Sequence, residues 1–217
     1  GDDVLDGGAG GDTYRVTGNE AGGWASFHSY DTYQDTGTSG TDKIAALGTG
    51  NVDIGFKGNF GAAGGIEAID ATGATGTVRL LGDGGNSTLD FRTVTLTGSN
   101  IVIDGAYGHD VLYGSAQDNV IVSGWGDDTV DGAGGSDTYR ITGNTTADFQ
   151  GYDVYADTGT TGTGKVVALH RRQLIAARGA ELQTAVQARR DIGPQLRSDF
   201  GKPGQRPIKL PGTRHQS

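Results

Sequence analysis

Four nonapeptides follow one another without a gap over residues 105–140: GAYGHDVLY, GSAQDNVIV, SGWGDDTVD and GAGGSDTYR. Each unit begins with small residues, carries Asp or Asn at its sixth position and an apolar residue at its eighth. The sixth positions are Asp110, Asn119, Asp128 and Asp137, and the eighth positions are Leu112, Ile121, Val130 and Tyr139. A strict period of nine predicts a repeat architecture in which each unit adds one short strand to a shared core.

The composition of each unit suggests what its two halves do. Glycine readily adopts positive φ, so a glycine-rich turn can bring its backbone close to a bound ion. The backbone carbonyls of such a turn and an acidic side chain are hard oxygen ligands for that ion. The apolar eighth residue begins a strand. Two units form a coil of 18 residues, and stacked coils lie about 4.8 Å apart. Asp110 should therefore lie over Asp128, and Asn119 over Asp137, and facing carboxylates repel unless a cation lies between them.

This pattern resembles the glycine-rich repeat of RTX (hemolysin-type) calcium-binding proteins, G-G-x-G-x-D-x-U-x. The resemblance implies an all-β fold, a parallel β-roll or β-solenoid with glycine-rich calcium-binding turns, and Ca²⁺ as the cofactor. It also implies one ion between the turns 105–110 and 123–128 and another between 114–119 and 132–137. We expect the second site to be weaker, because Gln117 and Asn119 replace a glycine and an acid.

The resemblance further implies a set of metal-ligating residues, which bind through carboxylates or through backbone carbonyls. These are Asp110, Asp128, Asn119, Asp137, Asp3, Asp12, Gly105, Tyr107, Gly108, Gly124, Trp125, Gly126, Gly132, Gly134 and Gly135. A degenerate unit, GDGGNSTLD at residues 82–90, has Ser87 at the sixth position. We expect no ion there.

Composition limits the fold class. The chain has 41 glycines in 217 residues but a hydrophobic content of only 34%, which fits the narrow core of a solenoid better than a broad globular core. The absence of cysteine excludes disulfides and thiolate metal sites. No apolar run has the length of a membrane-spanning helix, so we expect no membrane span.

Charge divides the chain into an acidic body and a basic tail. Before His170 there are 23 of the 26 Asp and Glu residues but only seven of the 17 Lys and Arg residues. An acidic body needs counter-ions to become compact, which agrees with calcium. The basic tail alone does not favour nucleic acid as a partner.

The chain also contains a long internal repeat. Residues 1–19 match 126–144, and YDTYQDTGTSGTDKIAAL at 30–47 matches YDVYADTGTTGTGKVVAL at 152–169. We interpret the second pair as a Gly/Thr-rich loop or cap standing off the solenoid, with Asp31, Asp35, Asp153 and Asp157 in solvated turns. Asp42 aligns with Gly164, so the two copies do not share that acid.

These boundaries predict six segments. They are a partial repeat at 1–19, a loop or cap at 20–50, irregular β-solenoid coils at 51–104, the nonapeptides at 105–144, a second loop or cap at 145–169, and a basic tail at 170–217 that is helical or disordered. Because the chain begins at Gly1 in mid-repeat, we expect a processed or excised piece of a longer protein, with half-built sites at Asp3 and Asp12. The tail could derive from a frameshift or a fusion.

No catalytic motif emerges from the sequence. The four histidines have no metal-ligand spacing, and no nucleophile elbow is present. We therefore expect a non-enzymatic, calcium-binding module of a secreted bacterial protein, located outside the cell, that folds on binding calcium and serves as a structural or adhesive scaffold. Its expected partners are calcium ions, other copies of itself through the solenoid ends, and a cell-surface or polysaccharide ligand. The alternative is a fragment of a secreted carbohydrate-active β-helix enzyme.

Overall fold

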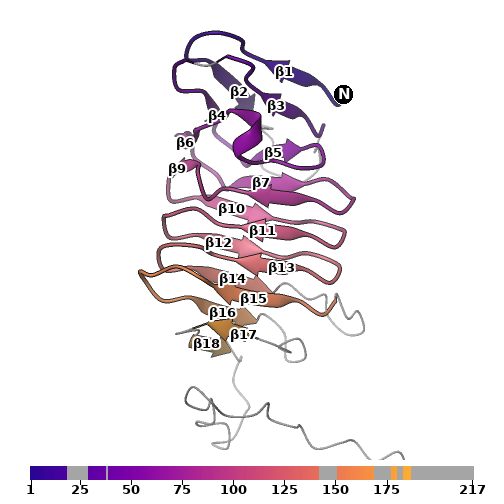
Figure 1. Ribbon diagram of the computed structural model, residues 1–217, viewed down its shortest axis with the longest axis vertical. Helices are drawn as coiled ribbons and strands as arrows, with labels where there is room; N and C mark the ends of the chain where they lie inside the picture. Colours follow the sequence, from indigo (N-terminus) through magenta and orange to yellow (C-terminus); the bar gives the residue numbers. More distant parts are fainter. Residues whose placement is uncertain (19–28, 38, 142–150, 169–176, 180–182, 187–217) are drawn as a thin grey trace, which may run out of the picture. The chain divides into compact units, whose positions relative to one another are not determined.

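The computed structural model describes residues 1–18, 29–37, 39–141, 151–168, 177–179 and 183–186, all within one compact unit, Gly1–Gln187. Apart from a single 3₁₀ turn, η1 (Ala62–Gly64), the regular elements of these residues are short strands. Figure 1 shows them stacked in chain order. The strands are β1 (Val4–Asp6), β2 (Thr13–Thr17), β3 (Thr32–Gln34), β4 (Lys43–Gly48), β5 (Val52–Phe56), β6 (Ala68–Ala74), β7 (Val78–Gly82), β8 (Thr88–Asp90), β9 (Thr95–Thr97), β10 (Ile101–Asp104), β11 (Val111–Tyr113), β12 (Val120–Val122), β13 (Thr129–Asp131), β14 (Thr138–Ile141), β15 (Val154–Asp157), β16 (Lys165–Ala168), β17 (Ala177–Gly179) and β18 (Gln183–Val186).

Every strand pairing in the described residues is parallel, which confirms the predicted all-β parallel solenoid. The pairings form four sheets. Their strand orders are β1-β3, β2-β4-β6-β9, β5-β7-β10-β12-β14-β16-β18 and β8-β11-β13-β15-β17. Consecutive strands of the chain lie in different sheets, so each coil of the solenoid contributes one strand to each sheet that it crosses.

The nonapeptides form the predicted two-sheeted roll. Ile121 pairs with both Ile103 and Tyr139, and Leu112 pairs with Val130. Equivalent positions are therefore 18 residues apart. The four eighth-position side chains are at most 1% exposed, as predicted. Alternation along each short strand puts their neighbours on the opposite face.

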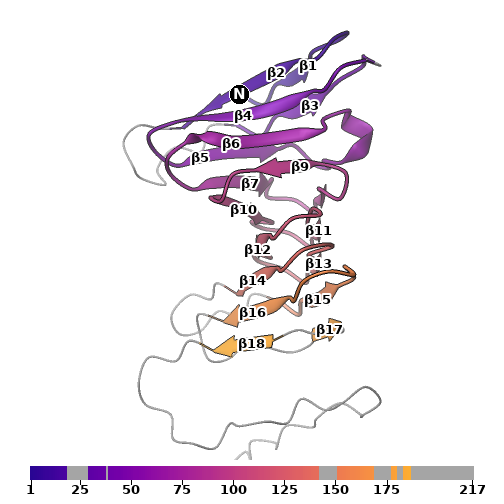
Figure 2. The same ribbon diagram turned by 90° about the vertical axis from the view of Figure 1, so that its left-hand side faces the viewer.

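The coils before the nonapeptides are longer and cross a third sheet. Stacked positions are 30 residues apart at Asp12 and Asp42, 25 at Asp42 and Glu67, and 23 at Ser87 and Asp110. Figure 2 shows the sheet β2-β4-β6-β9 from its own side, where it ends at β9. Beyond β9 the coils shorten to two strands each, so the solenoid narrows into the roll.

Aromatic side chains fill the wider part of the core. Phe56 contacts Tyr33, Phe60 and Phe91 with ring centroids 5.8, 4.3 and 5.9 Å apart. Tyr14 meets Tyr33 edge to face at 5.8 Å. In the roll, Leu112, Ile121 and Val130 fill the space between two sheets, and Tyr139 and Tyr155 pack together at 5.6 Å where the next coils begin. The phenylalanine cluster thus occurs where a third sheet increases the volume to be filled.

Two segments expected to stand off the solenoid are part of it. Strand β3 pairs with β1 and β4 with β2, while β15 and β16 extend the two sheets of the roll. The interpretation as a separate loop or cap is therefore wrong for these strands. The Gly/Thr-rich composition is misleading because the coil needs only a few inward side chains, here Tyr33 and Ile44 in the first copy.

The tail expected to be helical or disordered contributes two strands where it is described. Strand β17 pairs with β15, and β18 pairs with β16. An unpaired sheet edge is a template for a further strand, which explains why pairing overrides the helical spacing of the apolar residues here. The rest of 170–217 lies outside the described residues. Within the described part of the chain, no helix has the length and apolar character to cross a membrane.

We predict that Val130→Asp destabilises the roll strongly, by about 3–5 kcal/mol, because it buries an unpaired charge. Val130 is fully buried, whereas its neighbour Thr129 on the same strand is exposed. The matched control is therefore Thr129→Asp, which should change stability little. Urea unfolding followed by circular dichroism in saturating calcium measures both. Equal midpoints for the two variants would show that the assigned inward and outward faces are wrong.

Candidate metal centre

The turns of the roll require glycine because neighbouring coils approach each other closely. Gly126 has φ of 128°, and a Cβ atom there would collide with the carbonyl oxygen of Gly108 in the coil before it. Gly124, with φ of 103°, faces the carbonyl of Ala106 in the same way. The turns therefore stack as backbone on backbone, with carbonyl oxygens crowded between them.

The sixth-position residues of one edge form a hydrogen-bonded ladder. The backbone N–H of Ser87 donates to Oδ1 of Asp110 at 2.8 Å, and that of Asp110 donates to Oδ1 of Asp128 at 2.8 Å. The N–H of Asp128 then donates to Oδ1 of Asp153 at 3.2 Å. Each carboxylate thus reaches back to the coil before it and uses one oxygen there.

The opposite edge carries the same kind of ladder. The N–H of Asn119 donates to Oδ1 of Asp137 at 2.9 Å. Asn119 itself turns toward Ser115, whose N–H it accepts at 2.7 Å and whose hydroxyl its amide reaches at 2.9 Å. The predicted stacking of Asp110 with Asp128 and of Asn119 with Asp137 is therefore present on both edges.

The second carboxylate oxygen of three ladder aspartates is buried without a partner. Oδ2 of Asp110, Asp128 and Asp137 accepts no hydrogen bond, although each of these residues is only 1% exposed. A buried acceptor without a partner costs about 1–3 kcal/mol, and more when it carries charge. Such oxygens, held at fixed places among turned carbonyls, are what a hard cation needs.

In three turns the first glycine leaves room for such an oxygen. A Cβ atom at Gly105 would lie 2.7 Å from Oδ2 of Asp110, and one at Gly132 would collide with Oδ2 of Asp137. Gly7 has the same relation to Asp12, at 2.6 Å. The unpartnered oxygen thus lies against bare backbone. The donor set, carboxylate oxygens among carbonyls, fits calcium and does not fit a metal that prefers nitrogen or sulfur.

Comparison with protein families agrees with this geometry. Residues 1–14 and 104–139 match the family model of the RTX calcium-binding nonapeptide repeat, in four copies. The chain carries RTX repeats. Searches of curated proteins and of solved structures gave no match. The matched residues end at 139, so the coils before and after the RTX repeats are described by the structure alone.

The other residues expected as ligands in the RTX turns have different environments. Gly108 and Gly135 adopt φ of 125° and 95° in their turns. The N–H of Gly108 donates to the carbonyl of Trp125 at 2.8 Å, so that carbonyl already joins two coils. The ring of Tyr107 stacks on that of Trp125 and is 61% exposed. Gly134 packs against Ala116 in the coil before it. Whether these carbonyls bind an ion stays a prediction.

The two N-terminal candidates lie in similar ladders. The N–H of Asp3 donates to Oδ1 of Asp31 at 3.0 Å, and Asp3 is exposed. The N–H of Asp12 donates to Oδ1 of Asp42 at 2.6 Å, and Asp42 donates its own N–H to Glu67 at 2.8 Å. The coil that follows, expected to be a solvated loop, therefore supplies partners for both.

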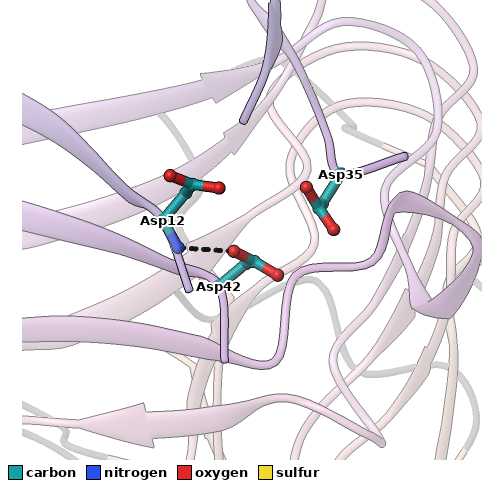
Figure 3. A group of neighbouring side chains, drawn as sticks. All are labelled: Asp12, Asp35 and Asp42. Carbon is teal, nitrogen blue, oxygen red and sulfur yellow. Dashed lines mark hydrogen bonds between the residues drawn. The ribbon is translucent and has the colours of Figure 1, made fainter. Parts of the chain in front are cut away.

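One cluster of acids extends beyond the RTX match, which includes Asp12 but not Asp35 or Asp42. Single carboxylate oxygens of Asp12, Asp35 and Asp42 lie within 4.8 Å of one another, and Figure 3 shows the three side chains pointing toward a common space. Asp42 is only 3% exposed. The sequence signal was the segment GTSGTDKIA at 37–45, which has glycine, Asp and an apolar residue at the fourth, sixth and eighth positions of a nonapeptide. This unit begins with Gly-Thr and lacks the second glycine of the repeat pattern, so the sequence alone does not reveal it as a repeat unit.

Burial governs the charge of the ladder aspartates. It raises the pKa of Asp110 and Asp137 to about 7 and that of Asp128 to about 6, against an ordinary value of 3.8. The hydrogen bond from the preceding coil lowers each pKa. Neighbouring negative charges also raise these pKa values. The charge of Asp128 raises the pKa of Asp110, that of Asp157 raises the pKa of Asp137, and that of Asp153 raises the pKa of Asp128. Without a cation, protons are therefore the available counter-charge.

We predict opposite pH dependences with and without calcium. Because the folded pKa values are raised, protonation stabilises the calcium-free fold at low pH, and this stabilisation is lost as the pH rises through about 6–7. Calcium needs the ionised carboxylates, so its contribution grows over the same interval. Thermal unfolding at about pH 5 and about pH 8, with chelator and with calcium, tests this. A Tm that rises with pH in chelator would contradict it.

Proposed function

We propose that this chain is a calcium-binding module that folds on binding calcium and acts as a structural or adhesive scaffold outside the cell. The observation that carries the proposal is the set of buried, unpartnered carboxylate oxygens of Asp110, Asp128 and Asp137 in the glycine-rich turns. The match of this region to the RTX calcium-binding repeat supports the choice of ion.

The energetic argument starts from the metal-free chain. Ordering glycine-rich turns costs more backbone entropy than ordering other residues, and stacked carboxylates repel at neutral pH. A narrow core, to which each short strand contributes few inward side chains, offsets only part of these costs. When bound, calcium supplies the positive charge and the oxygen coordination that the unpartnered Oδ2 atoms lack. Calcium that binds only the folded state stabilises it by about 2.7 kcal/mol when free calcium is in hundredfold excess over Kd.

Extracellular calcium suits such a device. We expect affinities on the order of 10⁻⁴–10⁻³ M, as in other extracellular calcium modules. At lower concentrations the chain stays unfolded, and at higher concentrations it folds. Secretion, a role as scaffold and the absence of catalysis are parts of this proposal. Self-association through the solenoid ends and a cell-surface or polysaccharide ligand stay predictions.

The alternative, a carbohydrate-active enzyme fragment, requires carboxylates and aromatic rings along one open groove. In the described residues, the buried ladder acids Asp110, Asp128 and Asp137 serve the turn-to-turn stacking instead. Of the stacked pair Tyr107 and Trp125, Tyr107 is exposed and Trp125 half-buried, and the pair lies on the turn edge of the roll. The arrangement therefore favours the calcium-binding module.

We predict that calcium converts the chain from a largely unfolded to a β-rich state, and that Asp128→Asn weakens this response by about tenfold or more in calcium concentration. Asp128 is 1% exposed with an unpartnered oxygen, whereas the adjacent Asp127 is exposed. Asp127→Asn is therefore the matched control and should titrate like the parent chain. Circular dichroism during a calcium titration measures all three. β-rich spectra in chelator, with no metal retained, would sink the proposal.

A further inference from the structure

The internal repeat of the sequence is also a repeat of contacts. In the first copy the hydroxyl of Tyr14 accepts the N–H of Gly7 at 2.7 Å and donates to the carbonyl of Gln34 at 2.8 Å. In the second copy the hydroxyl of Tyr139 accepts the N–H of Gly132 at 2.9 Å and donates to the carbonyl of Ala156 at 2.7 Å. The last RTX unit of each block thus holds the next coil in the same way.

The residue after each held carbonyl is an aspartate. Asp35 follows Gln34, and Asp157 follows Ala156. Asp35 directly follows β3, and Asp157 is the last residue of β15. Each forms, with the threonine after it, a two-residue spacer outside every nonapeptide. A tyrosine of the RTX block therefore determines where the spacer carboxylate lies relative to the last ladder aspartate of that block, Asp12 or Asp137.

Each spacer carboxylate has a buried oxygen without a partner. Asp35 accepts the N–H of Gly37, and Asp157 accepts those of Gly159 and Gly164, which is the ordinary role of aspartate at the start of a turn. In both residues, however, Oδ1 is buried and unpartnered. A turn-forming role accounts for one oxygen and leaves the other unexplained.

The ladder aspartates beside the spacers have the same property. Oδ2 of Asp12 and Oδ2 of Asp137 are buried and accept no hydrogen bond, and Asp137 is 1% exposed. A Cβ atom at Gly132 would collide with both Oδ2 of Asp137 and the hydroxyl of Tyr139, and that hydroxyl donates to the carbonyl of Ala156, so the backbone next to Asp157 lies close to Asp137. In the first copy, the oxygens of Asp12 and Asp35 lie within 4.8 Å of each other and of Asp42. Calcium–oxygen bonds of about 2.3–2.6 Å span such separations.

We propose that Asp35 and Asp157 are calcium ligands from outside the nonapeptide repeats, and that each completes a site between the last RTX turn and the coil that follows. The proposal rests on the proposed function, since it assumes that calcium binds to this module. The site of the first copy has three carboxylates, Asp12, Asp35 and Asp42 (Figure 3). The site of the second copy has Asp137 and Asp157 only, because Gly164 stands at the position of Asp42.

The consequence is a difference in affinity between two otherwise equivalent sites. A calcium site gains affinity with the number of carboxylates that it presents. The first copy should therefore bind more tightly than the second. Each ion would join the coil after the repeats to the repeats themselves, so that the Gly/Thr-rich segments fold together with the RTX turns.

The first test removes the charge of the spacer ligand. Asp35→Asn keeps an oxygen that can accept the N–H of Gly37 but loses the negative charge. We expect the variant to bind one calcium fewer per chain, or to bind it about tenfold more weakly, in equilibrium dialysis at defined free calcium. The control is Asp70→Asn, because Asp70 lies on β6 outside the cluster and its side chain accepts hydrogen bonds from Thr72.

The outcomes separate this inference from the proposed function. If the parent chain binds no calcium, the proposed function fails. If the parent and Asp128→Asn differ in bound calcium while Asp35→Asn and the parent do not, the spacer ligands are refuted and the proposed function stands. Loss of one ion in Asp35→Asn alone supports the spacer site.

The second test exchanges the residue that distinguishes the copies. Gly164→Asp gives the second copy the third carboxylate, and Asp42→Gly removes it from the first. We expect Gly164→Asp to lower Tm in chelator, because an added carboxylate faces Asp137, and to raise calcium affinity about tenfold. Asp42→Gly should lower the affinity by a similar factor. A Gly164→Asp variant that is destabilised equally with and without calcium, and binds no more tightly, would overturn the proposal.

Discussion

Asp110, Asp128 and Asp137 each accept a backbone N–H of the coil before with one carboxylate oxygen and bury the other oxygen without a hydrogen-bond partner. This half-satisfied carboxylate is the constraint on which the rest of the structure depends. It aligns successive turns, since the N–H of Asp110 can reach Asp128 only when the coils are in register. It also makes the aligned state costly without a counter-charge, because like charges are stacked out of water. Alignment and the need for a cation are thus two results of one geometry.

The same ladder tolerates coils of very different length. The spacing from one ladder residue to the next is 18 residues in the roll but 30 between Asp12 and Asp42. Additional residues of the longer coils go into a third sheet and its connections, where Phe56, Phe60 and Phe91 fill the core. The turn edge is therefore the constant part of the solenoid, and the cross-section of the core is the variable part. The RTX units keep the edge and reduce the core to its minimum.

The sequence predicted those features that repeat locally. The apolar eighth positions, such as Leu112 and Val130, are buried because a short strand exposes alternate residues to one side. The stacking of Asp110 on Asp128 followed from the period of nine. What escaped prediction was the continuation of the coil through residues 29–48, where glycine and threonine hide the phase and Tyr33 and Ile44 are the inward residues. Asp42 looked unimportant because its counterpart is Gly164, yet it lies in the three-acid cluster. Pairing of β17 and β18 depends on the sheet edges beside them, which no local pattern reports.

The central claim is that cations lie beside the unpartnered Oδ2 atoms of the turns. Anomalous diffraction from crystals grown with calcium at neutral pH measures this directly. The account requires anomalous peaks at about 2.3–2.6 Å from Oδ2 of Asp110, Asp128 and Asp137, with turn carbonyls completing the shell. If these oxygens instead bind water or a neighbouring carboxyl proton while calcium is present at millimolar concentration, the ladder is stabilised without metal and the account is wrong.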